Sequence, residues 1–328
     1  MVEKEQENQT ALTEFLLLGF GDIGNLWLLL FFLFLLIYIV TTIGNILIIV
    51  LVVVDRHLHT PMYFFLGNLS CLETCYSSNI LPLMLVNLLN GGQGTISVTT
   101  CMTQYYFFGF LAASECYLLA AMSYDRYVAI CKPLLYSALM SHRVCFQLVA
   151  GSWICGSLAI NITIYLMSQL QFCDSGKINH FFCDFNPILK VSCSDTHMIK
   201  LLTTFLAAVC SLPPFLLTLA SYVYIISTIM SIPSISGRQK AFSTCSSHLI
   251  VVSTFYGTIM IVYMLPKTDA LRDLNKIFSL FYTVLTPLFN PLIYSLRNRE
   301  VKEALKKVVV KLCAFECMQG CMLIHFFI

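Results

Sequence analysis

The stretch Met122-Ser-Tyr-Asp-Arg-Tyr-Val-Ala-Ile-Cys131 places an Asp-Arg pair at the end of a long apolar run that carries almost no other charge. Counting back from Arg126 to Cys101 gives 25 residues, which as a helix extend about 37 Å, enough to cross the hydrocarbon core of a bilayer with some tilt. A charged pair beside such a run belongs at a membrane edge. We therefore expect Cys101 on the oxidising side of the membrane, where it is free to form a disulfide. Asp125 and Arg126 are expected at the cytosolic face, where a partner can dock.

The composition is that of a membrane protein. Of 328 residues, 58% are hydrophobic and 11% are charged, and the mean hydropathy is +0.80, whereas soluble domains carry about 25% charged residues. The chain is long enough for two soluble domains, but its apolar runs are too long and too numerous to be soluble cores. A net charge of +2, scattered along the chain, is too small to suggest a nucleic-acid partner.

Seven apolar runs have the length of a membrane span, which predicts an all-α membrane protein with a bundle of seven transmembrane helices. The predicted spans are Leu26–Val54, Met62–Leu89, Ile96–Ile130, Val144–Leu170, Met198–Met230, Ala241–Leu265 and Ile277–Leu296. We expect an extracellular N-terminus over residues 1–25, a domain of seven transmembrane helices over 26–296, and a cytoplasmic helix and tail over 297–328. Residues 1–25 lack the basic start and short apolar run of a cleavable signal peptide, so the first span itself is expected to act as the signal.

Lys and Arg residues predict the orientation of the bundle. Twelve fall in the loops and tail on one side of the spans and seven on the other, and the richer side faces the cytosol. The N-terminus is therefore expected outside the cell and the C-terminus inside, in a multi-pass protein of the plasma membrane. In this orientation Asn8 of the sequon Asn8-Gln9-Thr10 is an expected glycosylation site.

After the last span, residues 299–311 place basic side chains on a helical pattern with Val301, Leu305, Val308 and Leu312. This pattern suits a short amphipathic helix on the anionic inner leaflet. A simple basic flank that stops transfer of the chain explains the same residues, and the sequence leaves both readings open.

Four of the fifteen cysteines lie on the predicted extracellular side, whereas most of the others fall inside spans, where cysteine behaves as a small hydrophobe. These four are Cys101, Cys173, Cys183 and Cys193, which allow three pairings. We favour Cys101 with Cys183, which ties the long loop across the mouth of the bundle. The remaining pair, Cys173 with Cys193, would then close a loop of about twenty residues.

Five stretches, one per expected span and in the expected order, resemble the signature stretches of vertebrate odorant (olfactory) receptors, a family of rhodopsin-like G-protein-coupled receptors. They are Leu58–Leu66 (LHTPMYFFL), Met122–Cys131 (MSYDRYVAIC), Ser221-Tyr222, Lys240–Leu249 (KAFSTCSSHL) and Pro287–Asn298 (PLFNPLIYSLRN). The long loop with His180–Asp184 (HFFCD) resembles class II, the type of land vertebrates. Ser123, Phe289 and Glu73 stand where the family usually has Ala, Leu and Asp, and none of these changes removes a required chemical group.

The resemblance implies a receptor, not an enzyme, that binds small, mostly apolar volatile odorants in the outer half of the bundle. It also implies an olfactory stimulatory heterotrimeric G protein as partner, a rise in cyclic AMP, and a location in the cilia of olfactory neurons. The implied ligand-binding residues are Tyr105, Phe108, Gly109, Ala112, Ala113, Leu206, Cys210, Ile259, Met260, Tyr263 and Thr283. Small residues at this spacing also serve helix packing, and that alternative stays open at each position.

The same resemblance implies a set of residues for activation and G-protein coupling. They are Asp125, Arg126, Tyr127, Tyr222, His248, Tyr256, Asn290, Pro291 and Tyr294. At rest, Arg126 is expected to be held by Asp125 or nearby groups. With the G protein bound, it is expected to be released toward the fifth and sixth spans, which makes a two-state element that ligand can bias.

Three rival functions fit the sequence less well. A receptor for a cationic amine needs a carboxylate in the outer part of a span, and Cys101–Ser114 contains none. A transporter is expected to show repeated halves and broken helices, and we find no internal repeat. An intramembrane enzyme could use Glu73 and Glu115 as acid and base, but the sequence shows no nucleophile or metal cluster around them.

Glu73 and Glu115 are the two acids deep inside predicted spans, where a carboxylate is rare and costly. Two nearby carboxylates repel each other if both ionise, so they either share a proton or bind a cation. Related receptors gather a sodium ion at the positions of Asn45, Ser70 and Asn290 together with these acids. We therefore expect sodium at Glu73 and Glu115, with a protonated, hydrogen-bonded pair as the alternative.

His180 belongs to a loop segment whose residue types, His, Cys and Asp, also bind metals. A disulfide at Cys183 would remove the thiolate that a metal requires. We therefore expect His180 to be a structural residue of the loop, with metal-assisted recognition of the ligand as the alternative.

Overall fold

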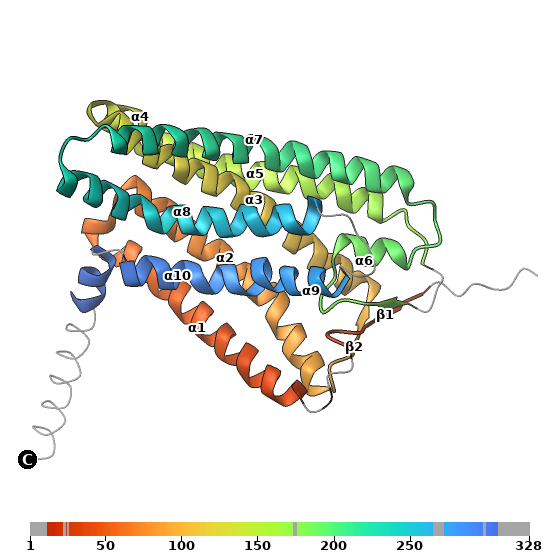
Figure 1. Ribbon diagram of the computed structural model, residues 1–328. Helices are drawn as coiled ribbons and strands as arrows, with labels where there is room; N and C mark the ends of the chain where they lie inside the picture. Colours follow the sequence, from red (N-terminus) through yellow and green to blue (C-terminus); the bar gives the residue numbers. More distant parts are fainter. Residues whose placement is uncertain are drawn as a thin grey trace, which may run out of the picture.

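The computed structural model describes residues 12–21, 24, 26–172, 176–264, 272–297 and 300–307. Its long helices run side by side as one bundle (Figure 1), and the predicted seven-helix architecture is confirmed. The first six spans are α1 (Leu26–Val54), α2 (Pro61–Leu89), α3 (Val98–Cys131), α5 (His142–Met167), α7 (His197–Met230) and α8 (Ile235–Met264). The seventh span consists of α9 (Arg272–Leu280), a π-helical turn η4 (Phe281–Leu285) and α10 (Thr286–Arg297).

The observed boundaries differ from the predicted ones by a few residues. Ile96 was expected to open the third span but lies in strand β2 (Gly94–Ser97), and α3 begins at Val98, after Ser97 caps it by accepting a hydrogen bond from the Thr100 amide at 3.1 Å. Six of the described spans are long and apolar enough to cross a membrane, whereas in α8 the apolar part is the shorter stretch His248–Ile259.

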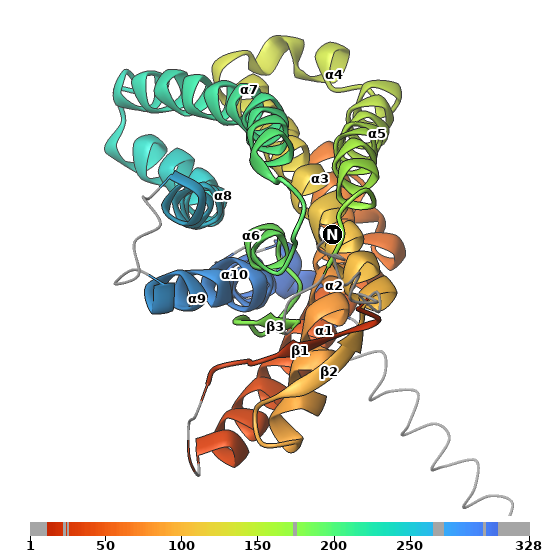
Figure 2. The same ribbon diagram turned by 90° about the vertical axis from the view of Figure 1, so that its right-hand side faces the viewer.

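Helix α3 is the central element of the bundle. It packs against α2, α5 and α7, and the view along the bundle shows it between these helices (Figure 2). The start of α3 lies at the loop that carries Cys183, and its other end lies at the loop that follows Arg126. We call these the disulfide end and the Arg126 end of the bundle.

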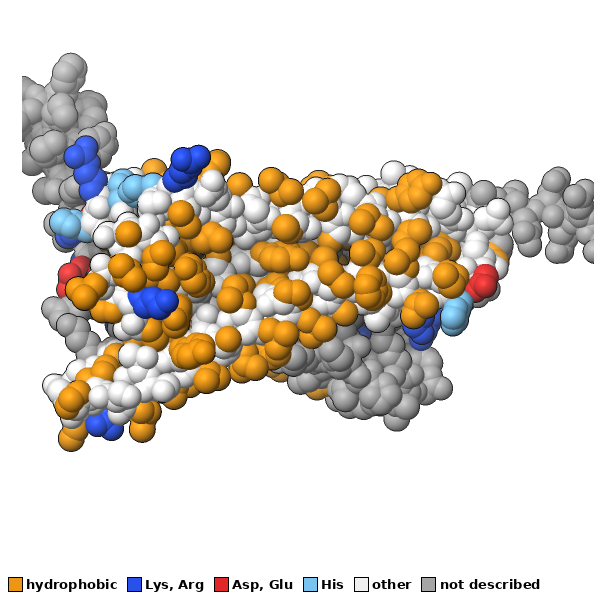
Figure 3. Space-filling view, turned by 90° about the horizontal axis from the view of Figure 1, so that it is seen from above, with side chains coloured by type: hydrophobic (Ala, Val, Ile, Leu, Met, Phe, Trp, Pro, Cys, Tyr) orange, Lys and Arg blue, Asp and Glu red, His pale blue; other side chains and the backbone are white. Residues whose placement is uncertain are grey.

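The outer faces of the helices are apolar, as a bilayer requires. Large hydrophobic side chains are exposed on α1, α5 and α7, among them Phe32, Phe146 and Phe205, each about 60% exposed or more. Seen from the side of α5 and α7, apolar side chains cover the face along its length and charged ones lie toward the two ends (Figure 3). Since lipid is as apolar as these side chains, the exposed surface needs no protein cover.

A small sheet closes the disulfide end. Strand β1 (Glu14–Leu17) pairs antiparallel with β2 and parallel with β3 (Lys177–Ile178), so that the order is β2-β1-β3. Phe15 and Leu17 of β1 are fully buried, and the Phe15 ring contacts Phe172 edge to face at 5.0 Å between centroids. Strand β1 therefore belongs to the core, whereas the sequence led us to expect only an extracellular terminus over residues 1–25.

Short helices shape the Arg126 end. They are η1 (Arg56–Leu58), η2 (Pro133–Leu135) and α4 (Tyr136–Leu139). Residues 300–307 form a further helix, whose Val301 and Ala304 are buried against the core. Tyr63 of α2 donates a hydrogen bond to Glu300 at 2.7 Å. Helical structure is confirmed for this part of the predicted amphipathic segment, whereas Val308 and Leu312 lie outside the described residues.

We predict that Phe15→Ala lowers the stability of the protein by about 3 kcal/mol, because the change leaves a cavity in place of a fully buried ring. Thermal unfolding of purified protein and antibody staining of the cell surface measure the effect. Glu14→Ala, an exposed position on the same strand, is the matched control and should behave like the parent. Equal melting temperatures for Phe15→Ala and the parent would show that β1 is not part of the folded core.

Candidate functional site

The face of α3 nearest the disulfide end is lined with buried aromatic rings. Tyr105 and Phe108 are each about 5% exposed or less. The Phe108 ring lies 5.6 Å from Tyr76 of α2, 6.0 Å from Tyr282 of the seventh span and 5.0 Å from Phe182 of the long loop. These rings bring three spans and the loop to one apolar region, which is where the ligand was expected.

The loop between α5 and α7 covers this region from the disulfide end. Its helix α6 (Phe185–Lys190) begins after Asp184, which accepts a hydrogen bond from the Phe185 amide at 2.8 Å. The Phe185 ring stacks on Tyr105 at 6.2 Å, and Phe182 is fully buried. A ligand held near Tyr105 and Phe108 would therefore be enclosed by the loop as well as by the spans.

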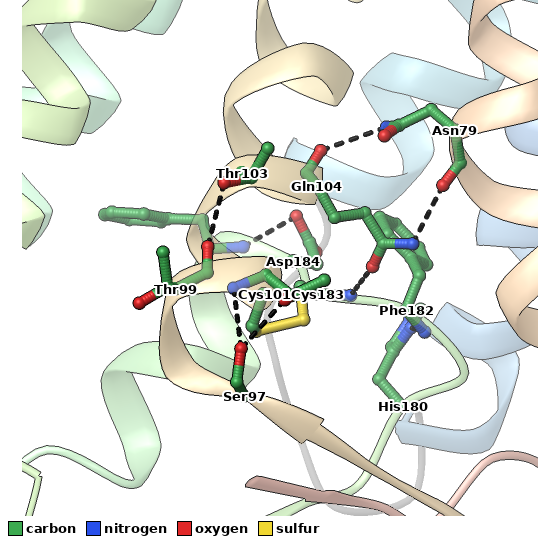
Figure 4. Close-up of a disulfide and its surroundings, with 12 residues drawn as sticks. Asn79, Ser97, Thr99, Cys101, Thr103, Gln104, His180, Phe182, Cys183 and Asp184 are labelled. Carbon is green, nitrogen blue, oxygen red and sulfur yellow. Dashed lines mark hydrogen bonds between the residues drawn. A yellow bond between two sulfur atoms is a disulfide. The ribbon is translucent and has the colours of Figure 1, made fainter. Parts of the chain in front are cut away.

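A disulfide and one glutamine fix the loop to the bundle (Figure 4). Cys101 and Cys183 are bonded, which confirms the predicted pair. Gln104, one turn further along α3, accepts a hydrogen bond from the Cys183 amide at 2.9 Å and donates one to the Asn79 carbonyl of α2 at 2.9 Å. Asn79 in turn donates to the Gln104 carbonyl at 3.0 Å. Gln104 therefore joins α2, α3 and the loop at one buried point.

The second predicted disulfide falls partly outside the described residues. Cys193 is disulfide-bonded, and Cys173, its predicted partner, lies outside the part of the chain that the structure describes. Phe172, next to it, forms an isolated antiparallel bridge with Ser192, so the two arms of this loop run together. The sequon residue Asn8 also lies outside the described residues.

Gly109 lies at a helix contact. A Cβ built on Gly109 would overlap the Cδ1 atom of Ile160 on α5, and Ile160 is itself buried. The terminal carbon of Ile160 therefore occupies the space that a side chain at Gly109 would need. This geometry fits the alternative role of Gly109, which is close packing between α3 and α5. That Gly109 contacts ligand stays a prediction.

The other predicted ligand residues are spread over several environments. Ala112 packs against the core cluster at the disulfide end, whereas Ile259 packs against the cluster at the Arg126 end. Thr283 is fully buried and its hydroxyl donates to the Ser279 carbonyl of its own helix at 2.6 Å. Ala113, Leu206 and Cys210 are half-buried. The side chains of Met260 and Tyr263 lie outside the described part, so the complete ligand set stays a prediction.

His180 is buried within the loop. Its ring lies 4.6 Å from Phe181 and 4.7 Å from Phe182, and its Nδ1 accepts a hydrogen bond from the Phe182 amide at 3.4 Å. Burial first, and then the nearby charge of Lys276, lower the pKa of His180 to about 3. The disulfide occupies the sulfur of Cys183. These contacts favour the structural role over the metal-binding one.

At the Arg126 end, a buried ion pair closes α3. The Arg126 guanidinium donates to Asp125 through Nη2 and through Nε, the latter at 3.0 Å. The other carboxylate oxygen of Asp125 accepts a hydrogen bond from the Tyr136 hydroxyl of α4 at 2.8 Å. Asp125 is fully buried and Arg126 is 9% exposed. The contact expected of a resting receptor is present, and Tyr136 is a partner that the sequence did not reveal.

The fifth and sixth spans meet beside this pair. The Tyr222 hydroxyl of α7 lies 2.6 Å from Nδ1 of His248 on α8, so the two predicted coupling residues contact each other. Tyr256 of α8 donates to the Cys116 carbonyl of α3 at 2.9 Å, and the Tyr127 ring lies 5.9 Å from Tyr224 of α7. The side chain of Tyr294 lies outside the described residues.

Glu73 and Glu115 are both buried in the middle of the bundle. Glu73 accepts a hydrogen bond from Asn290 of α10, and Glu115 is near enough for the two charges to interact. Asn45 of α1 donates to the Pro287 carbonyl at 3.2 Å. Among the described residues, Oε2 of Glu73, Oε1 of Glu115 and Oδ1 of Asn45 are buried without a hydrogen-bond partner.

Comparison with known proteins identifies the family. A sequence model described as "Olfactory receptor" matches residues 34–312. Human olfactory receptor 2AP1 is 48% identical over 306 residues, 93% of this chain and 99% of the relative. Human olfactory receptor 11L1 is 49% identical over 94% of this chain and 96% of its own, and mouse olfactory receptor 5AP2 is 47% identical over 93% and 96%. The chain belongs to the olfactory receptor family. It is a multi-pass membrane receptor and not an enzyme.

We predict that Gln104→Leu lowers the stability of the receptor by about 2 kcal/mol, because the Asn79 carbonyl and the Cys183 amide lose their buried partner. Thermal unfolding of the purified receptor measures the loss. Thr103→Val is the control. Thr103 is the exposed residue just before Gln104, and its hydroxyl donates to the Thr99 carbonyl of the same helix. An unchanged melting temperature for Gln104→Leu would contradict the role assigned to this glutamine.

We also predict that Gly109→Leu lowers surface expression of the receptor, because the added side chain collides with Ile160 and overpacks the contact between α3 and α5. The double variant Gly109→Leu with Ile160→Ala should recover expression, because alanine vacates the space. Surface staining and dose-response curves distinguish the alternatives. Normal staining of the single variant with an altered ligand response would show instead that Gly109 contacts ligand.

Proposed function

We propose that this olfactory receptor binds small, mostly apolar odorants beneath the loop at the disulfide end and activates a stimulatory heterotrimeric G protein, which raises cyclic AMP. The observation that carries the proposal is the pairing of two features on one helix. Tyr105 and Phe108 of α3 lie in an enclosed apolar region, and Asp125 and Arg126 form a buried ion pair at the opposite end. A ligand that shifts α3 can therefore act on the ion pair directly.

The proposed orientation places the disulfide end outside the cell. Disulfides persist on the oxidising side of a membrane, and the Lys and Arg residues of the loops and tail are more numerous toward the Arg126 end. The N-terminus is then extracellular and the C-terminus cytoplasmic, and the odorant reaches the receptor from outside, at the plasma membrane of olfactory cilia.

Activation, as we propose it, is the exchange of partners by Arg126. In the arrangement that the structure shows, Asp125 accepts hydrogen bonds from both Arg126 and Tyr136. The Tyr222 hydroxyl is hydrogen-bonded to His248. Breaking the Asp125–Arg126 contact frees the guanidinium to meet α7 and α8. A ligand favours this change only through contacts that differ between the two arrangements.

The test is a screen of volatile compounds on cells that express the receptor with an olfactory stimulatory G protein, read out as cyclic AMP. We predict that Arg126→Ala abolishes the response to any compound that activates the parent, because the released guanidinium is missing. Arg143→Ala removes an exposed arginine at the same end and should respond normally. Parent-like signalling by Arg126→Ala, at equal surface staining, would refute the mechanism.

We further propose that sodium binds between Glu73 and Glu115 in the resting receptor. The buried oxygens of Glu73, Glu115 and Asn45 that lack hydrogen-bond partners are of the kind that hard cations bind. A bound cation would also relieve the repulsion between the two acids. The alternative, a proton shared by the acids, satisfies the same electrostatic requirement.

We predict that basal and odorant-induced signalling change when sodium is replaced by choline at constant ionic strength. The double variant Glu73→Gln with Glu115→Gln should lose this dependence, because the amides keep the shape of the site without its charge. Identical activity of the parent receptor in the two buffers would exclude the sodium proposal and leave the shared proton in its place.

A further inference from the structure

A groove lies between α3, α5 and α7 in the half of the bundle toward the Arg126 end. It has a volume of about 340 Å³, within the range of small-molecule sites. It is separate from the aromatic region under the disulfide loop, since none of the rings that form that region lines the groove. The lining residues are Tyr117, Ala120, Ala121, Tyr124, Gln147, Leu148, Gly151, Ser152, Pro213, Pro214 and Leu217.

The groove is hollow because its walls carry small side chains. Ala120 and Ala121 form the floor on α3, and a Cβ built on Gly151 of α5 meets no other atom within 4 Å. Gly156, one and a half turns further along α5, is different, since a Cβ there would overlap the Ser114 hydroxyl. Helix α5 is therefore in close contact with α3 at Gly156 and leaves space at Gly151.

The third wall is interrupted by two consecutive prolines. Pro213 and Pro214 lie inside α7, and because proline has no N–H, the carbonyls four residues earlier lose their regular helical donors. Pro214 is buried, whereas Leu217 is 48% exposed. The groove thus begins at the packed helices and opens toward the outer side of α5 and α7. Apolar side chains cover that face of the molecule (Figure 3).

Its polar groups are unevenly placed. Gln147 and Tyr124 lie at the end nearest the membrane edge, Gln147 less than two turns from the start of α5 and Tyr124 next to Asp125. Ser152 is satisfied within its own helix by the Leu148 carbonyl at 2.7 Å, and Tyr117 at the opposite end lies beside Cys210. None of the described lining residues is charged.

We propose that this groove binds a membrane sterol, with the sterol hydroxyl at Gln147 and Tyr124 and the rings against Gly151 and the proline pair. A phospholipid keeps its charged headgroup in water at the membrane edge and would place only an acyl chain in the groove, which offers no hydrogen bond to Gln147 or Tyr124. A single neutral hydroxyl needs only an uncharged donor or acceptor near the membrane edge. The flat apolar body of a sterol fits a shallow groove without side chains at its centre, and the opening toward lipid gives it a route of entry.

The test uses full-length receptor in phosphatidylcholine nanodiscs that contain a photoactivatable cholesterol probe. After illumination, labelled peptides are identified by mass spectrometry. The parent should be labelled on peptides that contain Gln147–Ser152 and Pro213–Leu217, and excess cholesterol should compete. Gly151→Leu should reduce this labelling about tenfold, because the new side chain occupies the site. Ile162→Phe adds bulk at an exposed position of α5 outside the groove and should be labelled like the parent.

Two further arms keep the proposal falsifiable if Gly151→Leu folds poorly. Gln147→Leu preserves volume but removes the amide, and it should weaken competition by cholesterol. With the parent receptor, the 3α-hydroxyl epimer should compete less well than cholesterol. The proposal is overturned if groove labelling is not competed by cholesterol, if both epimers compete equally, or if a photoactivatable phosphatidylcholine labels the same peptides and cholesterol does not displace it.

Discussion

The bundle depends on the fixing of α3 at both of its ends. A helix in lipid satisfies its own backbone hydrogen bonds, so the backbone alone does not set its depth or rotation relative to its neighbours. The Cys101–Cys183 disulfide joins one end of α3 to the loop by a covalent bond. Gln104 strengthens this attachment through hydrogen bonds to α2 and to the loop. At the other end the buried Asp125 joins Arg126 to α4. A rigid helix held at two points transmits a change at one end to the other.

The two ends differ in how readily they change. The disulfide end is fixed by a covalent bond and is covered by the sheet built on β1, so under the proposed function it would enclose a ligand without needing to move. The Arg126 end depends on an ion pair, and a buried ion pair holds its partners only while its geometry is favourable. Under the proposed function, the same helix would carry a stable site for recognition and a reversible contact for signalling, with Glu73 and Glu115 between them.

Much of this arrangement could be predicted from the sequence, because the length of an apolar run is a local property. The apolar pattern predicts every span boundary to within six residues, and it also favours the Cys101–Cys183 pair that the structure contains. The misses come from contacts between distant segments. Strand β1 is only four residues long, and although Phe15 to Leu17 are apolar, nothing in the sequence identifies residues 94–97 and 177–178 as its partners. The contact between Gly109 and Ile160 is of the same kind, since nothing near Gly109 in the sequence reveals Ile160.

The central claim is that this receptor passes a signal to a G protein through α3. The most direct measurement is guanine-nucleotide exchange on purified stimulatory G protein added to membranes that contain the receptor, with and without an activating odorant. The account predicts that the odorant speeds exchange and that membranes without the receptor show no such effect. Movement of the odorant or of ions across the membrane, with no change in the exchange rate, would contradict it.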